Sequence, residues 1–190
     1  MLIILSFYSI NNNIATFGQQ SDAQFDNGNV NIVAVGDFYF NDETEDTIEN
    51  IISVNPELIT TTGDHVKDEE SASCWIEMSQ PIKDKMKIAI GNHDRDSSKI
   101  YKQITRYHNL TSPYYSHDFN NILFISMSTE HPFEEGSKQY EFIKSDLEKT
   151  SQNPNVKWII VHQHKPLYST DQDKLEAEQL RDTYQQLFQQ

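Results

Sequence analysis

Residues 88–94 read IAIGNHD, a short apolar run that ends in Gly-Asn-His-Asp. Two earlier runs end in a similar way, because residues 33–37 read VAVGD and residues 59–64 read ITTTGD. If the three runs are neighbouring parallel strands, roughly 4.8 Å apart, their ends bring two carboxylates, an amide oxygen and an imidazole to one edge of a sheet. Open α/β sheets bind their ligands at that edge. The pattern therefore predicts an α/β fold with a site at these strand ends.

The composition limits the possible functions. The chain has 190 residues, which favours one domain with a sizeable core, and its formal net charge is −14. This acidic balance argues against a nucleic-acid-binding surface, because phosphate backbones need clustered Lys and Arg. An anionic substrate would have to be drawn by metal ions, although a solvated acidic surface is the simpler explanation of the charge. The single cysteine, Cys74, excludes an intrachain disulfide and is expected to be a packed thiol beside Trp75.

The first 30 residues differ from the rest. Residues 1–10, MLIILSFYSI, have the length of the apolar part of a signal peptide and are too short to span a membrane. No Lys or Arg precedes them and no clear cleavage site follows, so a disordered tail is the alternative. We expect residues 1–30 to be signal-like or disordered and residues 31–190 to form the domain. Secretion or cell-surface location follows if the segment is a signal, and a cytoplasmic location otherwise.

The remaining pattern alternates strands and helices. Helices are expected at residues 42–54, 74–85 and 99–108, after Ser137 as N-cap, and at residues 173–190. Strands are expected at residues 58–62, 87–90 and 156–161, and a hairpin pairs residues 114–119 with 122–127. Two consecutive β-α-β steps imply a parallel sheet with right-handed crossovers. Since the last helix should lead to a further strand, we expect the domain to be incomplete at its C-terminus.

The donors at the strand ends suit a metal centre. Asp64 can bridge two ions, because it follows the middle strand and has two carboxylate oxygens to share, while Asp37 and Asn92 would serve one ion each. Such a pair of ions, roughly 3.5–4 Å apart, can clamp a phosphoryl group. A lone Gly-Asp is usually a turn or a helix cap, but three such ends in similar places favour metal binding.

Histidines supply the remaining candidate groups. His93 follows Asn92 and could donate a proton to a leaving oxygen, with Asp94 holding its tautomer. A surface His-Asp pair is the alternative. Residues 159–168, IIVHQHKPLY, form another strand that ends in polar donors. Its His164 should reach the sheet edge, whereas a core or supporting role fits His162 better. The other histidines are expected to be ordinary loop or surface residues: His65, His108, His117 and His131, of which His65 is the least secure because it adjoins Asp64.

With these sites in view, the chain resembles the calcineurin-like metallophosphoesterases, most closely their purple-acid-phosphatase-like branch, from about residue 31 to residue 190. Residues 36–37 (GD), 63–64 (GD), 91–94 (GNHD) and 164–168 (HKPLY) match the first four sequence blocks of the family. Residues 128–130, 136–140 and 158–161 also look like that branch. The resemblance implies a metallophosphoesterase-type β-sandwich flanked by helices, hydrolysis by a metal-bound hydroxide, His93 as the catalytic histidine, and four metal ligands: Asp37, Asp64, Asn92 and His164.

Two departures concern tyrosine. The first block of the family often has Asp-x-His, or Asp-x-Gly in the purple branch, but this chain has Asp37-Phe38-Tyr39. Tyr39 is then either a replacement ligand or a gate. The purple branch also carries a tyrosine ligand to ferric iron three residues after its second aspartate, and Lys67 stands there instead. Unless Tyr39 compensates, no purple Fe(III)-tyrosinate centre is expected.

The third departure is the absence of the last block, Gly-His-x-His, which in the family supplies one histidine to each metal. By the family scheme, one ion keeps Asp64, Asn92 and His164, and the other keeps only Asp37 and Asp64. We therefore expect two divalent or trivalent ions, chosen from Fe, Mn and Zn, with the second ion weakly held.

Two functions follow from this reading. The first is a metal-dependent phosphoesterase acting on small phosphate mono- or diesters, with His93 assisting the leaving group. The second is a non-catalytic metal- or phosphate-binding protein that keeps the fold without turnover, which the missing block, Tyr39 and Lys67 favour. Hydrolysis that depends on added metal discriminates between them.

Overall fold

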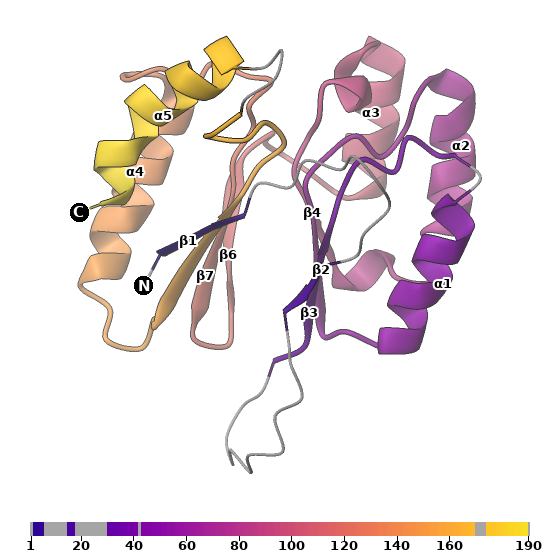
Figure 1. The fold of residues 1–190 in the computed structure, drawn as a ribbon, viewed down its shortest axis with the longest axis horizontal. Coiled ribbons are helices and arrows are strands. Elements are labelled where there is room, and N and C mark those ends of the chain that lie inside the picture. Colours follow the sequence, from indigo (N-terminus) through magenta and orange to yellow (C-terminus); the bar gives the residue numbers. More distant parts are fainter. Residues whose placement is uncertain (1, 6–14, 18–29, 42, 170–173, 190) are drawn as a thin grey trace.

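The computed structural model describes residues 2–5, 15–17, 30–41, 43–169 and 174–189. Within them, two four-stranded sheets face each other, and helices cover the outer face of each sheet (Figure 1). The expected α/β architecture, a β-sandwich flanked by helices, is confirmed.

The first sheet contains the strands that lead to the Gly-Asp and Gly-Asn turns. Its strands, in spatial order, are β2 (Ala15–Phe17), β3 (Ile32–Val35), β4 (Leu58–Thr61) and β5 (Met86–Ile88). Strands β3, β4 and β5 are parallel, whereas β2 is antiparallel to β3. The connections run through α1 (Thr44–Val54), α2 (Glu69–Met78) and a short 3-10 helix (Lys83–Lys85). The two predicted β-α-β steps are therefore present.

The second sheet has the spatial order β1 (Leu2–Leu5), β8 (Trp158–His162), β7 (Ile122–Ser126) and β6 (Tyr115–Phe119). The predicted hairpin forms β6 and β7, and β1 and β7 both run parallel to β8. Helices α4 (Lys138–Ser151) and α5 (Lys174–Phe188) cover its outer face (Figure 1). Within the segment expected to be signal-like or disordered, residues 2–5 and 15–17 form strands, while residues 6–14 and 18–29 lie outside the described residues. Export stays a prediction.

Capping side chains explain where the helices begin. Ser137 accepts a hydrogen bond from the backbone N–H of Tyr140, as predicted for the start of α4. The expected start of the second helix at residue 74 is wrong. Asp68 accepts from the backbone N–H of Ser71 at 2.9 Å and completes a capping box, so α2 begins five residues earlier, at Glu69. Helix α3 (Ser98–Tyr107) begins after Ser97, whose side chain caps it in the same way.

Apolar side chains fill three zones, one between each sheet and its helices and one between the sheets. Trp75 of α2 is fully buried in the zone between the first sheet and its helices. Leu58, Ile122, Phe124 and Ile160 form the zone between the sheets. Cys74 is exposed, which corrects the expected packed thiol, because α2 turns Trp75 rather than Cys74 toward the core.

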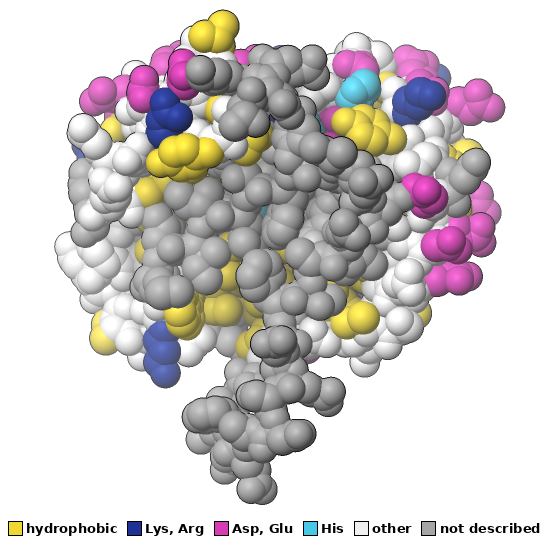
Figure 2. All heavy atoms as spheres, viewed as in Figure 1, with side chains coloured by type: hydrophobic (Ala, Val, Ile, Leu, Met, Phe, Trp, Pro, Cys, Tyr) yellow, Lys and Arg dark blue, Asp and Glu magenta, His cyan; other side chains and the backbone are white. Residues whose placement is uncertain are grey.

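Many of the acidic side chains lie on the surface. Asp and Glu side chains gather on the side of the molecule that carries α1 and α2 (Figure 2). Glu45, Asp46 and Glu49 of α1 are exposed there, as are Glu69 and Glu70 of α2. No helix among the described residues is long and apolar enough to cross a membrane.

Buried polar contacts tie the two sheets together. The backbone oxygen of Ile88 in β5 accepts from the hydroxyls of Tyr115 and Ser126, each at 2.9 Å. His162 Nδ1 lies 3.2 Å from the backbone oxygen of Thr61, so it can donate across the interface. These directional contacts fix how the ends of β8 meet the ends of β4 and β5. His162 has the core role that the sequence favoured.

Several histidines are less accessible than expected. His65 is fully buried, which corrects its assignment as a loop or surface residue. Burial lowers the pKa of His108 and of His117 to about 3, and that of His162 to about 4. Neither ring nitrogen of His117 has a hydrogen-bond partner among the described residues, and its ring stacks on Phe124 with 5.1 Å between centroids.

The burial of His117 predicts that the fold loses stability in acid, and His117→Phe should reduce this loss. A histidine with a depressed folded-state pKa stabilises the fold above its unfolded pKa of 6.5 and loses that contribution as pH falls toward 3. Phenylalanine keeps the stacked ring without the proton site. Urea unfolding of chelator-treated protein between pH 4.5 and 7.5 should show a flatter pH dependence for the variant, by about 1.4 kcal/mol per pH unit at most. Parallel curves for variant and wild type would contradict this.

Candidate metal centre

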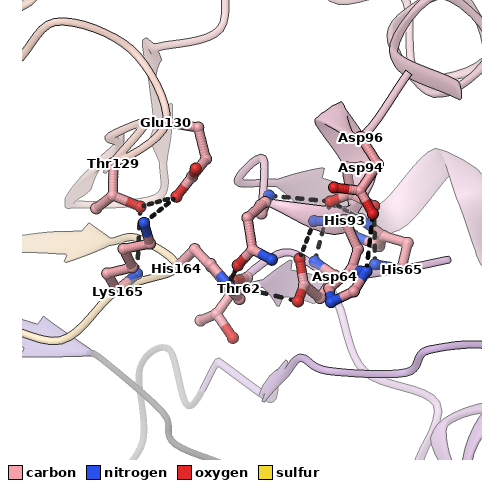
Figure 3. Close-up of polar contacts among 12 residues, drawn as sticks. Thr62, Asp64, His65, His93, Asp94, Asp96, Thr129, Glu130, His164 and Lys165 are labelled. Carbon is pink, nitrogen blue, oxygen red and sulfur yellow. Dashed lines mark hydrogen bonds and ion pairs between the residues drawn. The ribbon is translucent and has the colours of Figure 1, made fainter. Parts of the chain in front are cut away.

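Four strand ends converge on one site. Asp37 follows β3, Asp64 follows β4, Asn92 follows β5 and His164 follows β8. Asp37, Asp64 and His164 each offer a ligand atom, and these atoms lie within 4.8 Å of one another. Asn92 Oδ1 lies 2.9 Å from His164 Nε2. The structure thus brings together all four predicted ligands, and Figure 3 shows Asp64 and His164 side by side near its centre.

Glycines permit this close approach of backbone segments. A Cβ atom added to Gly91 would overlap the carboxylate and backbone N–H of Asp64, and one added to Gly63 would lie 2.5 Å from the backbone nitrogen of Gly91. Gly63 also has φ +93°, and the neighbouring Asp64 has φ +52°. A left-handed turn at two successive positions redirects the chain at the end of β4, which places the Asp64 side chain at the sheet edge.

The turn is held by a buried carboxylate. Asp94 accepts hydrogen bonds from the backbone N–H groups of Asp64, His65 and Gly91, at 2.9–3.0 Å, and lies 2.9 Å from His65 Nδ1. Burial would raise the pKa of Asp94, but His65 and these hydrogen bonds outweigh it and hold the pKa below its usual value. Asp94 is therefore an ionised anchor that holds Asp64 in place, and Figure 3 shows it joined to His65.

The predicted pairing of Asp94 with His93 is corrected. Residues 93–95 form a 3-10 helix, in which adjacent side chains point in different directions and residues three apart align. Asp94 consequently faces inward to His65, whereas His93 Nδ1 lies 3.1 Å from Asp96 Oδ2. The side chain of His93 remains 34% exposed, and its backbone N–H donates to Asp64 Oδ1 at 2.9 Å.

The donor arrangement fits a cation. His164 Nδ1 lies 2.8 Å from the backbone oxygen of Thr62, which can only accept, so Nδ1 carries a hydrogen. His164 Nε2 then faces Asn92 Oδ1 at 2.9 Å and Asp64 Oδ2 at 3.5 Å. Asp64 Oδ2 is buried and accepts no hydrogen bond from the described residues. A proton on Nε2, or a metal ion in its place, would satisfy these oxygens, and carboxylate, amide and imidazole donors are common ligands of Fe, Mn and Zn.

Asp37 and Tyr39 complete the open side of the centre. Burial raises the pKa of Asp37 to about 6, helped by the Asp64 carboxylate and opposed by His164. Burial, together with the nearby carboxylates of Asp64 and Asp37, raises the pKa of Tyr39. The Tyr39 ring meets His93 edge-on at 5.2 Å between centroids.

Two features of the site were missed by sequence reasoning. The His65–Asp94 pair is one, although the position of His65 beside Asp64 was a signal. The other is Lys165, whose Nζ lies 3.3 Å from Glu130 Oε1 and 2.6 Å from Glu176 Oε2. The backbone N–H of Lys165 also donates to Thr129 at 3.3 Å, and Arg95 donates to the backbone oxygen of Glu130. These contacts attach the loops after β7 and β8 to the site (Figure 3).

Comparison with known proteins agrees with this geometry. The family model described as calcineurin-like phosphoesterase matches residues 30–188. The chain belongs to the calcineurin-like phosphoesterase family. The resemblance expected from the sequence is therefore confirmed at the level of the family.

Two similar proteins and one solved structure carry the name purple acid phosphatase. "Probable inactive purple acid phosphatase 9" of Arabidopsis thaliana is 42% identical over 57 residues, which is 30% of this chain and 9% of that protein. "Purple acid phosphatase 15" of the same plant is 22% identical over 178 residues, covering 73% of this chain and 33% of the relative. The structure of purple acid phosphatase PPD1 from yellow lupin (Lupinus luteus) seeds has a TM-score of 0.68 at 20% identity. The match covers 83% of this chain and 35% of the lupin protein chain. The chain thus spans about a third or less of the lengths of these relatives.

The raised pKa of Asp37 predicts pH-dependent metal binding. Below about pH 6 the carboxylate is protonated in the metal-free protein, so metal must displace that proton. Protonation of Asp37 alone should therefore lower the association constant for Zn²⁺ by up to about tenfold per pH unit below pH 6. Asp37→Asn should bind more weakly at pH 7.5 but with a flatter pH dependence. Calorimetric titrations from pH 5 to 7.5 measure both, and an equal slope for both proteins would contradict the assignment.

The close approach at Gly91 predicts a selective defect. Gly91→Ala drives a methyl group into Asp64, so metal affinity should fall by roughly tenfold or more. Gly136→Ala is the control, because nothing lies within 4 Å of the added Cβ and only its φ of +83° is strained. That control should lose about 1 kcal/mol of stability and keep its metal affinity. Equal affinity in the Gly91 variant and wild type would show that the approach is not critical.

Proposed function

We propose that this chain forms the metal-binding part of a metal-dependent phosphoesterase that hydrolyses small phosphate mono- or diesters. The observation that carries the proposal is the convergence of two carboxylates, an amide oxygen and an imidazole at one sheet edge, beside a partly exposed histidine. Bound divalent or trivalent ions would polarise the phosphoryl group and lower the pKa of a water ligand. Asp64, between the other ligands, is suited to bridge two ions, with Asp37 on one side and Asn92 and His164 on the other.

His93 is the candidate proton donor to the leaving oxygen. Its backbone N–H is committed to Asp64, which fixes the residue at the rim of the centre, while its side chain contacts Asp96 and Tyr39. A carboxylate beside Nδ1 favours the hydrogen on that nitrogen. Asp96 thus takes the orienting role that the sequence assigned to Asp94, and the remaining nitrogen, Nε2, can exchange a proton with the substrate.

His93→Ala tests this division of roles. The substitution preserves the backbone hydrogen bond to Asp64, so the metal content should stay near that of wild type. Turnover of an aryl phosphate should fall by about 10²-fold or more because the proton donor is lost. Both quantities are measured on the same preparations, by elemental analysis and by steady-state hydrolysis with saturating Mn²⁺ or Zn²⁺. Equal losses of metal and turnover would instead make His93 a ligand or a structural residue.

The His93→Ala experiment has two controls. Asp64→Asn should lose both metal and hydrolysis, and His131→Ala, a half-buried histidine bonded to Ser128, should lose neither. Stoichiometric metal binding by wild type without metal-dependent hydrolysis would support the non-catalytic alternative. One relative carries the words "probable inactive" in its name.

A further inference from the structure

A second cavity lies on the side of the sandwich where β5 and β6 are the edge strands of the two sheets. It has a volume of about 420 Å³ and is lined by residues of β5, β6 and the loop that follows α3. None of the four predicted metal ligands lines it. Among the described residues that do, none is Asp or Glu, although the chain contains 29 acidic residues. The lining thus has the opposite charge character to the chain as a whole.

Lys87 reaches this cavity from the inner face of the first sheet. It pairs in register with Thr60 of β4, which faces the same side of the sheet as Leu58, a residue packed between the sheets. A lysine in such a position normally pairs with a carboxylate. The ion pairs among the described residues do not include Lys87. The cavity therefore contains an uncompensated positive charge.

His117 lines the cavity from the second sheet. It pairs in register with Phe124 of β7, whose ring packs between the sheets and stacks on the imidazole. Both ring nitrogens of His117 are buried and have no hydrogen-bond partner among the described residues. A neutral imidazole carries one N–H group, and a buried donor without an acceptor is unfavourable. The cavity wall therefore has a second group that requires an acceptor.

The loop after α3 adds neutral donors on a third side. Ser112 Oγ accepts from the backbone N–H of Tyr114 at 3.3 Å, which leaves its hydroxyl hydrogen free to donate. The hydroxyl of Thr111 and the amide of Asn109 line the same cavity. Hydroxyl and amide groups can donate to an anion without adding charge.

One carboxylate is bonded to a residue of the lining, but it lies on the other face of the second sheet. Ser116, next to His117 in β6, donates to Asp146 of α4. Because side chains alternate along a strand, Ser116 points toward α4 whereas His117 points between the sheets. Asp146 consequently does not neutralise Lys87.

We propose that this cavity binds a small tetrahedral oxyanion of the phosphate or sulfate class, held by Lys87, the ring N–H of His117 and the hydroxyl of Ser112. The three donors come from β5, from β6 and from the loop, so they approach from different directions, which suits oxygens arranged around a central atom better than a planar carboxylate. The anion compensates the lysine charge and accepts from the buried imidazole. This site needs no metal ion and does not rest on the proposed function.

The test is a titration of inorganic phosphate into the chelator-treated full chain, whose metal-free centre carries carboxylates that repel the anion. Calorimetry gives the dissociation constant, and NMR follows the ring signals of His117, assigned by their loss in His117→Phe. Wild type should bind one phosphate and shift these signals. Lys87→Met keeps the aliphatic stem and should weaken binding by about tenfold or more. Ser112→Ala should weaken it by roughly threefold or more.

The matched control is Lys144→Met, which removes a lysine of α4 outside the cavity and should bind phosphate as wild type does. Sulfate, titrated in the same way, should shift the same His117 signals, and the two dissociation constants identify the preferred oxyanion. Acetate should bind more weakly than either.

Three results would overturn the inference. Unshifted His117 signals at saturating phosphate would mean that the cavity holds water only. Equal affinity in a folded Lys87→Met and in wild type would place the anion elsewhere, and acetate binding as tight as phosphate binding would contradict a tetrahedral site. Metal-dependent hydrolysis of an aryl phosphate by wild type would leave the proposed function standing in each case, because the cavity and the metal centre share no residue.

Discussion

The buried carboxylate of Asp94 is the contact on which the site depends. It collects three backbone N–H groups and one ring nitrogen from the loops that follow β4 and β5. An isolated buried charge is very unfavourable, whereas one that accepts several hydrogen bonds is both tolerated and strongly directional. The carboxylate can be satisfied only when the two loops adopt this arrangement. The position of Asp64, and with it the centre of the site, follows from that requirement.

The second sheet reaches the same place through two histidines of one strand end. His162 and His164 approach the backbone oxygens of consecutive residues, Thr61 and Thr62, from across the interface between the sheets. Their spacing of two residues puts both on the same side of the extended chain. His162 is fully buried and connects the two sheets, whereas His164 lies nearer the sheet edge and turns its Nε2 toward Asn92 and Asp64. A single strand therefore supplies both the connection between the sheets and a candidate ligand.

The sequence predicted what depends on local pattern. Apolar runs that end in Gly-Asp or Gly-Asn indicate parallel strands with polar donors at their ends, and the structure brings Asp37, Asp64 and Asn92 together as that pattern requires. The partner of Asp94 could not be read in this way, because it depends on whether residues 93–95 continue as a loop or wind into a 3-10 helix. That choice reverses the direction of one side chain and converts an expected contact with His93 into one with His65.

Contacts between distant segments were equally hidden. The interaction of Lys165 with Glu130 and Glu176 joins three regions of the chain, and charged residues of this kind look like ordinary surface positions in a sequence. The pairing of Leu2–Leu5 with β8 was obscured for another reason, since a short apolar run at a chain start has the composition of a leader as well as of a strand. Periodicity identifies an element, but not the neighbour that covers it.

Local strain and unpaired oxygens at the centre have a common physical meaning. Left-handed residues at Asp37, Tyr39 and Asp64, together with Asp64 Oδ2, which accepts no hydrogen bond from the described residues, make the metal-free site a place where the fold is held in an unfavourable state by its surroundings. A cation that binds these oxygens relieves their repulsion and binds the folded chain in preference to the unfolded one. Metal affinity and fold stability are then linked by mass action. The same geometry that would orient the ligands for chemistry would thus make a bound ion a structural component of the domain.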